Sequence, residues 1–169
     1  MNTAFICAGS NLGDRVGYLQ QANNLLNYTE GITVIMSSSL YESEPVGYKD
    51  QEWFVNAVLH IETTFTPLEL LEVCMRIEKQ LGRVRDLENQ WGERTLDLDI
   101  LFYDNKIINE DSLQIPHPRV HERAYALVPM LEIDPDFVHP KLKKTICEMH
   151  SELEEPEEVY LYGTRSMDF

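Results

Sequence analysis

The sequence lacks three features that would each place it in a special class of proteins. Its 169 residues include only three cysteines, widely spaced and without a Cys-x-x-Cys pair, which does not suit a disulfide framework or a zinc site. No apolar run approaches the roughly 20 residues that a membrane span needs. The first residues lack the basic segment that begins a signal peptide. We therefore expect a cytoplasmic protein with reduced thiols and no membrane partner.

Basic residues are also scarce. The chain has 14 Lys and Arg against 29 Asp and Glu, a formal net charge of −15. This balance argues against a nucleic-acid partner, because phosphate contacts need a basic surface. The acidic excess is heaviest in residues 148–158, which we interpret as a solvated segment with no assigned role. The length predicts a single domain over residues 1–169, and we expect it to be a monomer.

Two carboxylates interrupt an apolar stretch at residues 94–102, which is predicted to be a buried strand. Because successive side chains of a strand point to opposite faces, Asp97 and Asp99 share one face. The apolar side chains are predicted on the other face: Leu96, Leu98, Ile100 and Phe102. Two like charges about 5 Å apart repel by about 3 kcal/mol at an effective dielectric constant near 20. We therefore interpret the pair as ligands of Mg²⁺ or Mn²⁺; the alternative is a solvated sheet face.

Arginines gather just upstream of this pair, although arginine and lysine are scarce elsewhere. Arg83, Arg85 and Arg94 all lie within a short distance of Asp99 in the sequence. The planar guanidinium suits phosphate oxygens, and metal ions with arginines are typical of phosphoryl transfer. The alternative is that these arginines form surface ion pairs with the acidic residues between them.

The predicted elements alternate between strands and helices. Strands are expected at residues 4–8, 32–41 and 54–62 and at the Asp-bearing segment. Helices are expected from about residue 14, from Pro67 to Gly82, and over 122–131 with a disturbance at Pro129. The second of these helices is predicted to begin with a capping box of Thr66 and Glu69. The order predicts an α+β fold, a ferredoxin-like βαββαβ sandwich with helices on one face of its sheet. The last third is predicted to add a short helix and an edge strand at residues 159–162.

Several aromatic and polar residues are weaker signals when taken one by one. Phe54 and Asn56 share a strand face and could stack on and hydrogen-bond a flat heterocycle, although ordinary packing is the more frequent outcome. Trp91 and Tyr125 have the same ambiguity. His117 lies between two prolines on a loop, where a structural role is the commoner one. The turn at residues 9–13 lacks the P-loop and dinucleotide patterns, so a plain strand-to-helix turn is favoured over a phosphate cradle.

Together these segments resemble the 6-hydroxymethyl-7,8-dihydropterin pyrophosphokinase family of the folate pathway. The resemblance runs from about residue 3 to residue 139, and its most specific part is Arg-Thr-Leu-Asp-Leu-Asp-Ile at residues 94–100. The other matching segments are residues 9–13, 41–47, 54–57, 82–85 and 116–119.

The resemblance implies transfer of pyrophosphate from ATP to the hydroxymethyl group of a reduced pterin, giving AMP and the pterin diphosphate. It implies that Asp97 and Asp99 hold two Mg²⁺ ions that bridge the ATP phosphates. Arg83 and Arg94 would then act on the transferring phosphates. The implied partners are therefore ATP and a reduced pterin.

The resemblance also implies the binding residues. ATP would contact Arg85, His117 and Arg123, with Glu78 and Ile100 near the nucleotide. The pterin ring would lie between Phe54 and Tyr125. The remaining pterin contacts would be the side chain of Asn56, backbone groups of Ser43 and Val46, and Trp91.

The sequence departs from the family pattern at Gln90 and Glu93, where the family commonly has arginine and proline. We expect a looser catalytic loop and weaker ATP binding. Two other functions stay open at this point. A nucleotidyltransferase also uses Asp-x-Asp, but with a Gly-Ser pair shortly before it, whereas Gly9-Ser10 lies far upstream of Asp97. A non-catalytic ferredoxin-like binding module would not need the carboxylates and Arg94 together.

Overall fold

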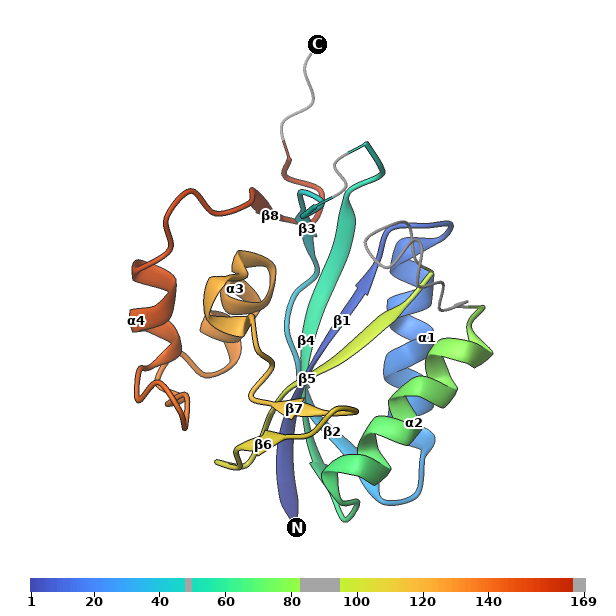
Figure 1. The fold of residues 1–169 in the computed structure, drawn as a ribbon. Helices are drawn as coiled ribbons and strands as arrows, with labels where there is room; N and C mark the ends of the chain where they lie inside the picture. The colour runs from blue at the N-terminus through green and yellow to red at the C-terminus, as the bar shows by residue number, and fades with distance from the viewer. Residues whose placement is uncertain (48–49, 83–94, 166–169) are drawn as a thin grey trace.

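The computed structural model describes residues 1–47, 50–82 and 95–165 (Figure 1). Its elements, in chain order, are β1 (Asn2–Ser10), α1 (Arg15–Tyr28), β2 (Ile32–Ser37), β3 (Tyr41–Ser43), β4 (Phe54–Thr63), α2 (Pro67–Gln80), β5 (Asp97–Tyr103), β6 (Ile108–Asn109), β7 (Gln114–Ile115), the 3₁₀ turn η2 (Val120–Glu122), α3 (Ala124–Ile133), α4 (Ile146–Ser151) and β8 (Val159–Leu161).

One antiparallel sheet organises the fold. Its strand order is β5-β1-β4-β3-β8, and β2 pairs with β4 on the same edge as β3. Strands β6 and β7 form a separate hairpin. The predicted α+β class with a C-terminal helix and edge strand is confirmed, with α4 as the helix and β8 pairing to β3. The specific ferredoxin-like description stays a prediction.

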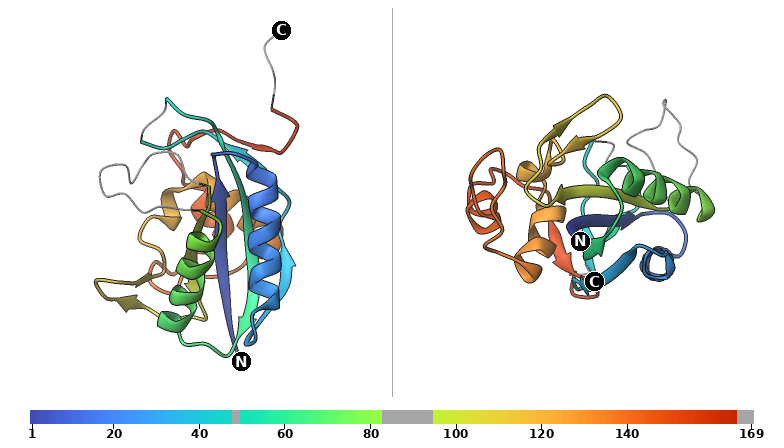
Figure 2. Two further views of the ribbon diagram at one scale, coloured as in Figure 1. Left: turned by 90° about the vertical axis from the view of Figure 1, so that its right-hand side faces the viewer. Right: turned by 90° about the horizontal axis from the view of Figure 1, so that it is seen from below.

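Helices cover both faces of the sheet, so the prediction of helices on one face is wrong. α1 and α2 lie side by side on one face, and α3 and α4 lie on the other (Figures 1 and 2). The physical reason is visible in β1, where every residue from Ala4 to Ser10 is buried. Phe5 and Cys7 join the core with α3, whereas Ala4, Ile6 and Ala8 join the core with α1 and α2. A strand that is apolar on both faces needs a layer on each side.

The strand predicted at residues 32–41 is two strands. β2 ends with Ser37 opposite Leu59, and β3 begins with Tyr41 opposite Asn56, so the connection holds one residue more than β4 can pair. Ser38 takes up the difference, because its hydroxyl accepts a 2.9 Å hydrogen bond from the backbone N–H of Val58. The ladder therefore breaks where a side chain replaces a backbone partner.

The strict alternation predicted for residues 96–102 fails at its end. Phe5 pairs with Phe102 but Ile6 pairs with Ile100, which leaves Leu101 as a bulge residue. Phe102 consequently belongs to the α3-side core, where its ring lies edge-on to Phe5 at 6.3 Å between centroids. The prediction that Phe102 shares a face with Leu98 is wrong because the bulge reverses the alternation.

The helix boundaries follow local signals. Thr66 and Glu69 form the predicted capping box of α2, with Pro67 in its first position. α3 continues through Pro129 to Ile133 and begins two residues later than predicted. Across the described ranges, none of the helices has both the length and the apolar character to cross a membrane.

Candidate active site

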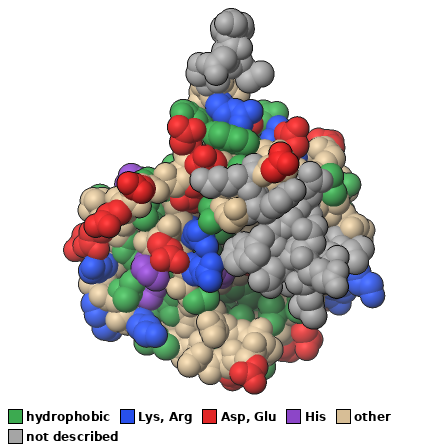
Figure 3. Space-filling view, turned by 45° about the horizontal axis from the view of Figure 1, so that its top comes forward, with side chains coloured by type: hydrophobic (Ala, Val, Ile, Leu, Met, Phe, Trp, Pro, Cys, Tyr) green, Lys and Arg blue, Asp and Glu red, His purple; other side chains and the backbone are tan. Residues whose placement is uncertain are grey.

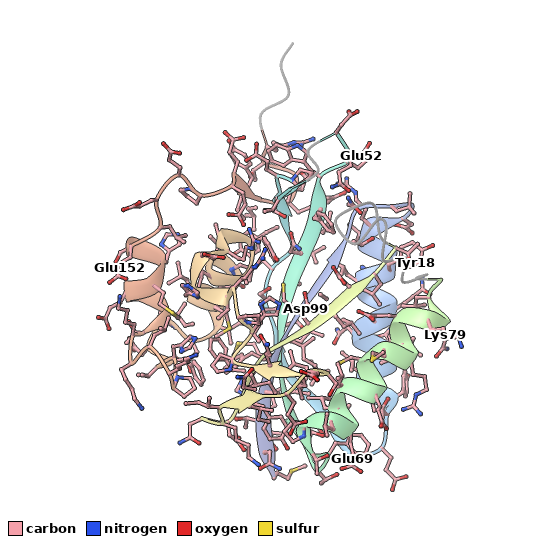
Figure 4. All side chains as sticks on the ribbon, in the orientation of Figure 1. Tyr18, Glu52, Glu69, Lys79, Asp99 and Glu152 are labelled. Carbon is pink, nitrogen blue, oxygen red and sulfur yellow. The ribbon has the colours of Figure 1, made fainter. Side chains whose placement is uncertain are left out.

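Asp97 and Asp99 lie at the start of β5 on the face that α3 covers. Asp97 pairs with Gly9, and Asp99 pairs with Cys7 of the α3-side core. Figure 4 shows Asp99 on the α3 side of β5. Burial raises the pKa of the Cys7 thiol well above its ordinary value, and the charges of Asp99 and Asp97 raise it further. Both carboxylates are therefore close enough to the thiol for their charges to act on it.

The donor set of this pair fits magnesium. Within residues 1–47, 50–82 and 95–165, no group of three or more His, Cys, Asp or Glu side chains could form a metal site made of protein alone. Mg²⁺ commonly binds one or two carboxylates and takes its other ligands from water and substrate phosphates. Asp97 and Asp99 offer two carboxylates, partly exposed and on one face. They suit a metal ion that arrives with a polyphosphate.

His117 and Arg123 border the same region. Burial lowers the pKa of His117, Arg123 lowers it further, and Asp97 acts in the opposite direction. His117 Nδ1 accepts a 3.2 Å hydrogen bond from the backbone N–H of Arg119. The neutral ring therefore carries its proton on Nε2, which can donate to a ligand. Figure 3 shows Lys or Arg side chains near His side chains on the face that it presents.

Tyr125 lies in the first turn of α3, on the same side of the sheet as these groups. It is partly buried and packs against the α3-side core. Burial raises the pKa of its hydroxyl, and the charges of Cys7 and Asp99 raise it further, so the phenol stays neutral at physiological pH. The Tyr125 hydroxyl is thus close enough to Asp97 and Asp99 for both of their charges to act on it.

A second set of polar side chains lies on the same sheet face, on β3 and β4. Asn56 and Ser43 are 3% and 1% exposed, and the Ser43 hydroxyl donates a hydrogen bond to Oδ1 of Asn56. Gly9 lies opposite Asn56, and a Cβ on Gly9 would be 2.8 Å from Nδ2 of Asn56 and 3.5 Å from the Phe54 ring. Ser43 therefore holds the carboxamide from one side, and the absence of a side chain at Gly9 leaves room for it on the other.

Gly9 separates the carboxamide from the carboxylates. It pairs with Asn56 on β4 and with Asp97 on β5. Because neighbouring strands are about 4.8 Å apart, the backbones at Asn56 and Asp97 are roughly 10 Å apart on one face. A flat ligand lying over Gly9 could meet both groups.

Glu78 and Ile100 are placed elsewhere. Ile100 is buried in the core with α1 and α2, on the face opposite the carboxylates. Glu78, on α2, is 2% exposed, and its Oε2 accepts a 2.8 Å hydrogen bond from the backbone N–H of Leu98. Ile100 is therefore part of β5 and Glu78 is bonded to it, but neither residue belongs to the cluster on the α3 side.

The remaining predicted site residues divide into two groups. Val46 lies, partly exposed, in the connection between β3 and β4. Six predicted positions lie outside the described residues. Four are site residues, namely Arg83, Arg85, Trp91 and Arg94, and two are the departures from the family pattern at Gln90 and Glu93.

Two positions in this region were missed by the sequence reasoning. Cys7 and Gly9 share a face with Phe5 by simple alternation along β1, so the strand period could have placed them. The hydrogen bond from the Ser43 hydroxyl had no signal in the sequence.

Comparison with known proteins defines the class first. Over 132 residues the chain is 48% identical to 2-amino-4-hydroxy-6-hydroxymethyldihydropteridine pyrophosphokinase of Bacillus subtilis, covering 78% of each chain. Over 140 residues it is 46% identical to the protein of the same name from Haemophilus influenzae, covering 83% of this chain and 86% of the other. The chain is therefore an enzyme of the diphosphokinase class of transferases.

The family follows from a second comparison. The sequence model of 7,8-dihydro-6-hydroxymethylpterin-pyrophosphokinase matches residues 5–135, and the chain belongs to this family. The resemblance seen in the motifs is confirmed.

Some longer proteins contain a region that is similar to this chain. Folic acid synthesis protein fol1 of Pneumocystis carinii is 43% identical over 169 residues, which cover 98% of this chain but 22% of fol1. The crystal structure of wild-type Plasmodium falciparum HPPK-DHPS with STZ-DHP has the same fold, with a TM-score of 0.72 at 18% identity over 89% of this chain and 43% of that one.

Proposed function

We propose that the protein transfers pyrophosphate from ATP to 6-hydroxymethyl-7,8-dihydropterin, giving AMP and the pterin diphosphate for folate synthesis. The observation that carries this proposal is the arrangement around Gly9. It puts a group suited to an amide edge, Asn56, and a group suited to metal-bound phosphate, Asp97, on one sheet face. A bicyclic pterin lying between them would direct its hydroxymethyl group toward the carboxylates.

The pterin lies between the rings of Phe54 and Tyr125 in this proposal. Asn56 presents its amide to the heterocycle, with its orientation held by Ser43. Backbone groups of Ser43 and Val46 provide further contacts with the pterin, and Trp91 is assigned as another contact. A carboxamide donates and accepts at once, which matches the paired N–H and C=O of a pterin edge.

ATP binds on the carboxylate side. Asp97 and Asp99 would hold two Mg²⁺ ions, and the chemistry that these ions would supply is neutralisation of charge on the ATP phosphates. His117 donates from Nε2 and Arg123 offers its guanidinium to phosphate oxygens. The other assigned contacts are Arg83, Arg85 and Arg94, with Glu78 and Ile100 bordering the nucleotide from the β5 edge.

The chemistry of these residues favours positioning over proton transfer. The raised pKa values of Cys7 and Tyr125 keep both groups protonated near neutral pH, so neither is a base there. The residues act by aligning the hydroxyl with the β-phosphorus and by neutralising charge. We propose that residues 1–169 act as one domain and as a monomer in the cytoplasm.

Product analysis by phosphorus NMR tests the reaction. The protein is mixed with ATP, Mg²⁺ and 6-hydroxymethyl-7,8-dihydropterin, and we expect AMP and a pterin diphosphate. ADP would show transfer of a single phosphoryl group and would contradict the proposal. Unchanged ATP despite Mg²⁺-dependent binding would favour the non-catalytic binding module.

A further inference from the structure

Among the four α-helices in the described part of the chain, α3 differs in how its N-terminus is capped. The side chains of Asp14, Thr66 and Thr145 cap α1, α2 and α4, each from the residue just before the helix. Arg123, at the same position of α3, makes no side-chain cap, and the first turn of α3 has no acidic residue. The helix that carries Tyr125 therefore lacks a local cap.

A residue far along the chain supplies the missing acceptor. The backbone N–H of Tyr125 donates a 3.1 Å hydrogen bond to Oε2 of Glu157, 32 positions later. A carboxylate at this place satisfies a free N–H group and interacts favourably with the helix dipole. Glu157 thereby fixes the first turn of α3.

Glu157 begins a segment, residues 157–165, which we name the C-terminal strap. The strap is attached to β3 and to the loop that follows it. The N–H of Glu44 donates to the carbonyl of Glu158 at 2.9 Å, and the N–H of Glu158 donates to Oε1 of Glu44 at 3.1 Å. Within β8, Val159 pairs with Ser43. The strap thus joins α3 to the strand that carries Ser43.

The strap also contacts the residue that precedes β4. The ring of Tyr160 stacks on Trp53 with 6.2 Å between centroids, and the guanidinium of Arg165 lies 4.1 Å from the centre of the same indole ring. Trp53 directly precedes Phe54. Three assigned pterin contacts, on α3, β3 and β4, are therefore bonded or adjacent to strap contacts.

We propose that Glu157 is a positioning residue for the pterin pocket, which caps α3 from the strap and so holds Tyr125 at a fixed distance from β3 and β4. The inference rests on the proposed function. Glu157 and the rest of the strap lie outside the 5–135 segment that the family model matches. The inference also assigns a role to one carboxylate of the acidic segment that the sequence left without one.

Binding measurements on Glu157→Ala test the inference. The dissociation constant of 6-hydroxymethyl-7,8-dihydropterin is measured in the presence of Mg²⁺ and a non-hydrolysable ATP analogue. We expect it to rise about tenfold, the size of effect that the loss of one helix cap can produce. The dissociation constant of the analogue alone should not change. Hydrogen exchange at the Tyr125 amide should accelerate.

Two further variants separate the cap from other effects. Glu157→Gln keeps an amide oxygen at the same distance and should restore most of the pterin affinity. Glu157→Asp keeps the charge but shortens the side chain, so it should weaken pterin binding as the alanine variant does. The matched control is Glu154→Ala, which removes an exposed carboxylate of the same segment and should change neither constant.

The outcomes distinguish the two proposals. Pterin binding by the wild-type chain that Glu157→Ala leaves unchanged would overturn the role of Glu157 alone. Equal weakening of pterin and analogue binding would also overturn it, because a general loss of structure does not select one ligand. If the wild-type chain does not bind the pterin, the proposed function is wrong and the inference with it.

Discussion

The face of the sheet under α1 and α2 carries apolar side chains along β1, β4 and β5, whereas the face under α3 is apolar at one end and polar at the other. Phe5, Val58 and Phe102 fill the apolar end on the α3 side. Asn56 and Asp97 occupy the polar end, on either side of Gly9. One face of the sheet thus contributes its side chains to the core, whereas the polar half of the other face is where we propose that the ligands bind. Substitutions on the two faces should therefore affect different measurements.

The largest effect is expected from Asp97→Ala, on the polar half. Loss of one carboxylate of the metal pair should lower kcat by about a thousandfold or more, because a preorganised charge contact at the phosphates is lost. The fold should stay intact, so thermal unfolding should occur near the wild-type temperature. The measurement is AMP formation at saturating substrates. Asp111→Ala, at an exposed carboxylate, is the control, and retained turnover in Asp97→Ala would remove the metal assignment.

Ile6→Ala, on the face under α1 and α2, is expected to lower the stability of the fold and to leave substrate binding unchanged. Ile6 is fully buried, and removing its side-chain atoms should lower the free energy of unfolding by about 3 kcal/mol. The variant should keep the wild-type KM for both substrates at temperatures where it is folded. Urea unfolding and steady-state kinetics give the two numbers. A raised KM for the pterin would show that the two faces are coupled.

Ser43→Ala tests the polar half more finely. It removes the hydroxyl that donates to Asn56 and leaves a buried acceptor unpaired, so pterin affinity should fall about tenfold. ATP affinity should be unchanged. Ser43→Thr keeps the hydroxyl and is the control that should restore binding. If the alanine and threonine variants bind the pterin equally well, the hydroxyl does not position the carboxamide.

The smallest expected effect is a loss of folding stability at acidic pH, which we assign to His139 on the α3 side of the sheet. His139 lies on the α3 side, edge-on to Phe102, and its Nδ1 accepts hydrogen bonds of 3.1 Å and 3.0 Å from the N–H groups of Lys141 and Leu142. Its pKa is lowered from 6.5 to about 4, chiefly by burial and also by the nearby charges of His121 and Lys141. Because the pKa of His139 is lower in the folded chain, the unfolded chain takes up the proton at a higher pH when the solution is acidified. The stability contributed by neutral His139 is therefore present above pH 6.5 and lost progressively toward about pH 4.

The variant His139→Asn keeps an acceptor but cannot titrate. Its free energy of unfolding should fall less than that of the wild-type chain between about pH 7 and pH 5. Urea unfolding at a series of pH values measures the difference. His150→Asn, which removes an imidazole from α4, is the control. Identical slopes for wild type and His139→Asn would rule out this contribution. Burial also lowers the pKa values of His60 and His117 on the α3 side, so some acid sensitivity should persist.

Local signals predicted the elements that depend on neighbouring residues. The Thr66–Glu69 capping box defined α2 because both partners lie within one turn. The two-residue period placed Asp97 and Asp99 on one face because β5 is regular there. The motifs were sufficient to identify the family.

The predictions that failed depended on partners distant in the sequence. Phe102 changed face because the bulge opposite Phe5 is set by pairing with β1, which the sequence of β5 does not contain. The strand predicted at residues 32–41 divided because β4 offers one residue too few. The second helical layer was missed because the burial of β1 on both faces was not recognised.

The sequence by itself determined the family, the capping box of α2, and the face shared by the two carboxylates, since each depends on side chains a few residues apart. Only the tertiary structure decided that Gly9 separates Asn56 from Asp97, that Ser43 holds the carboxamide, and that Glu157 caps α3. These contacts join residues 13 to 88 positions apart, counted from the paired positions. Their partners are fixed by strand pairing and by packing on the sheet, and local preference along the chain contains no information about either.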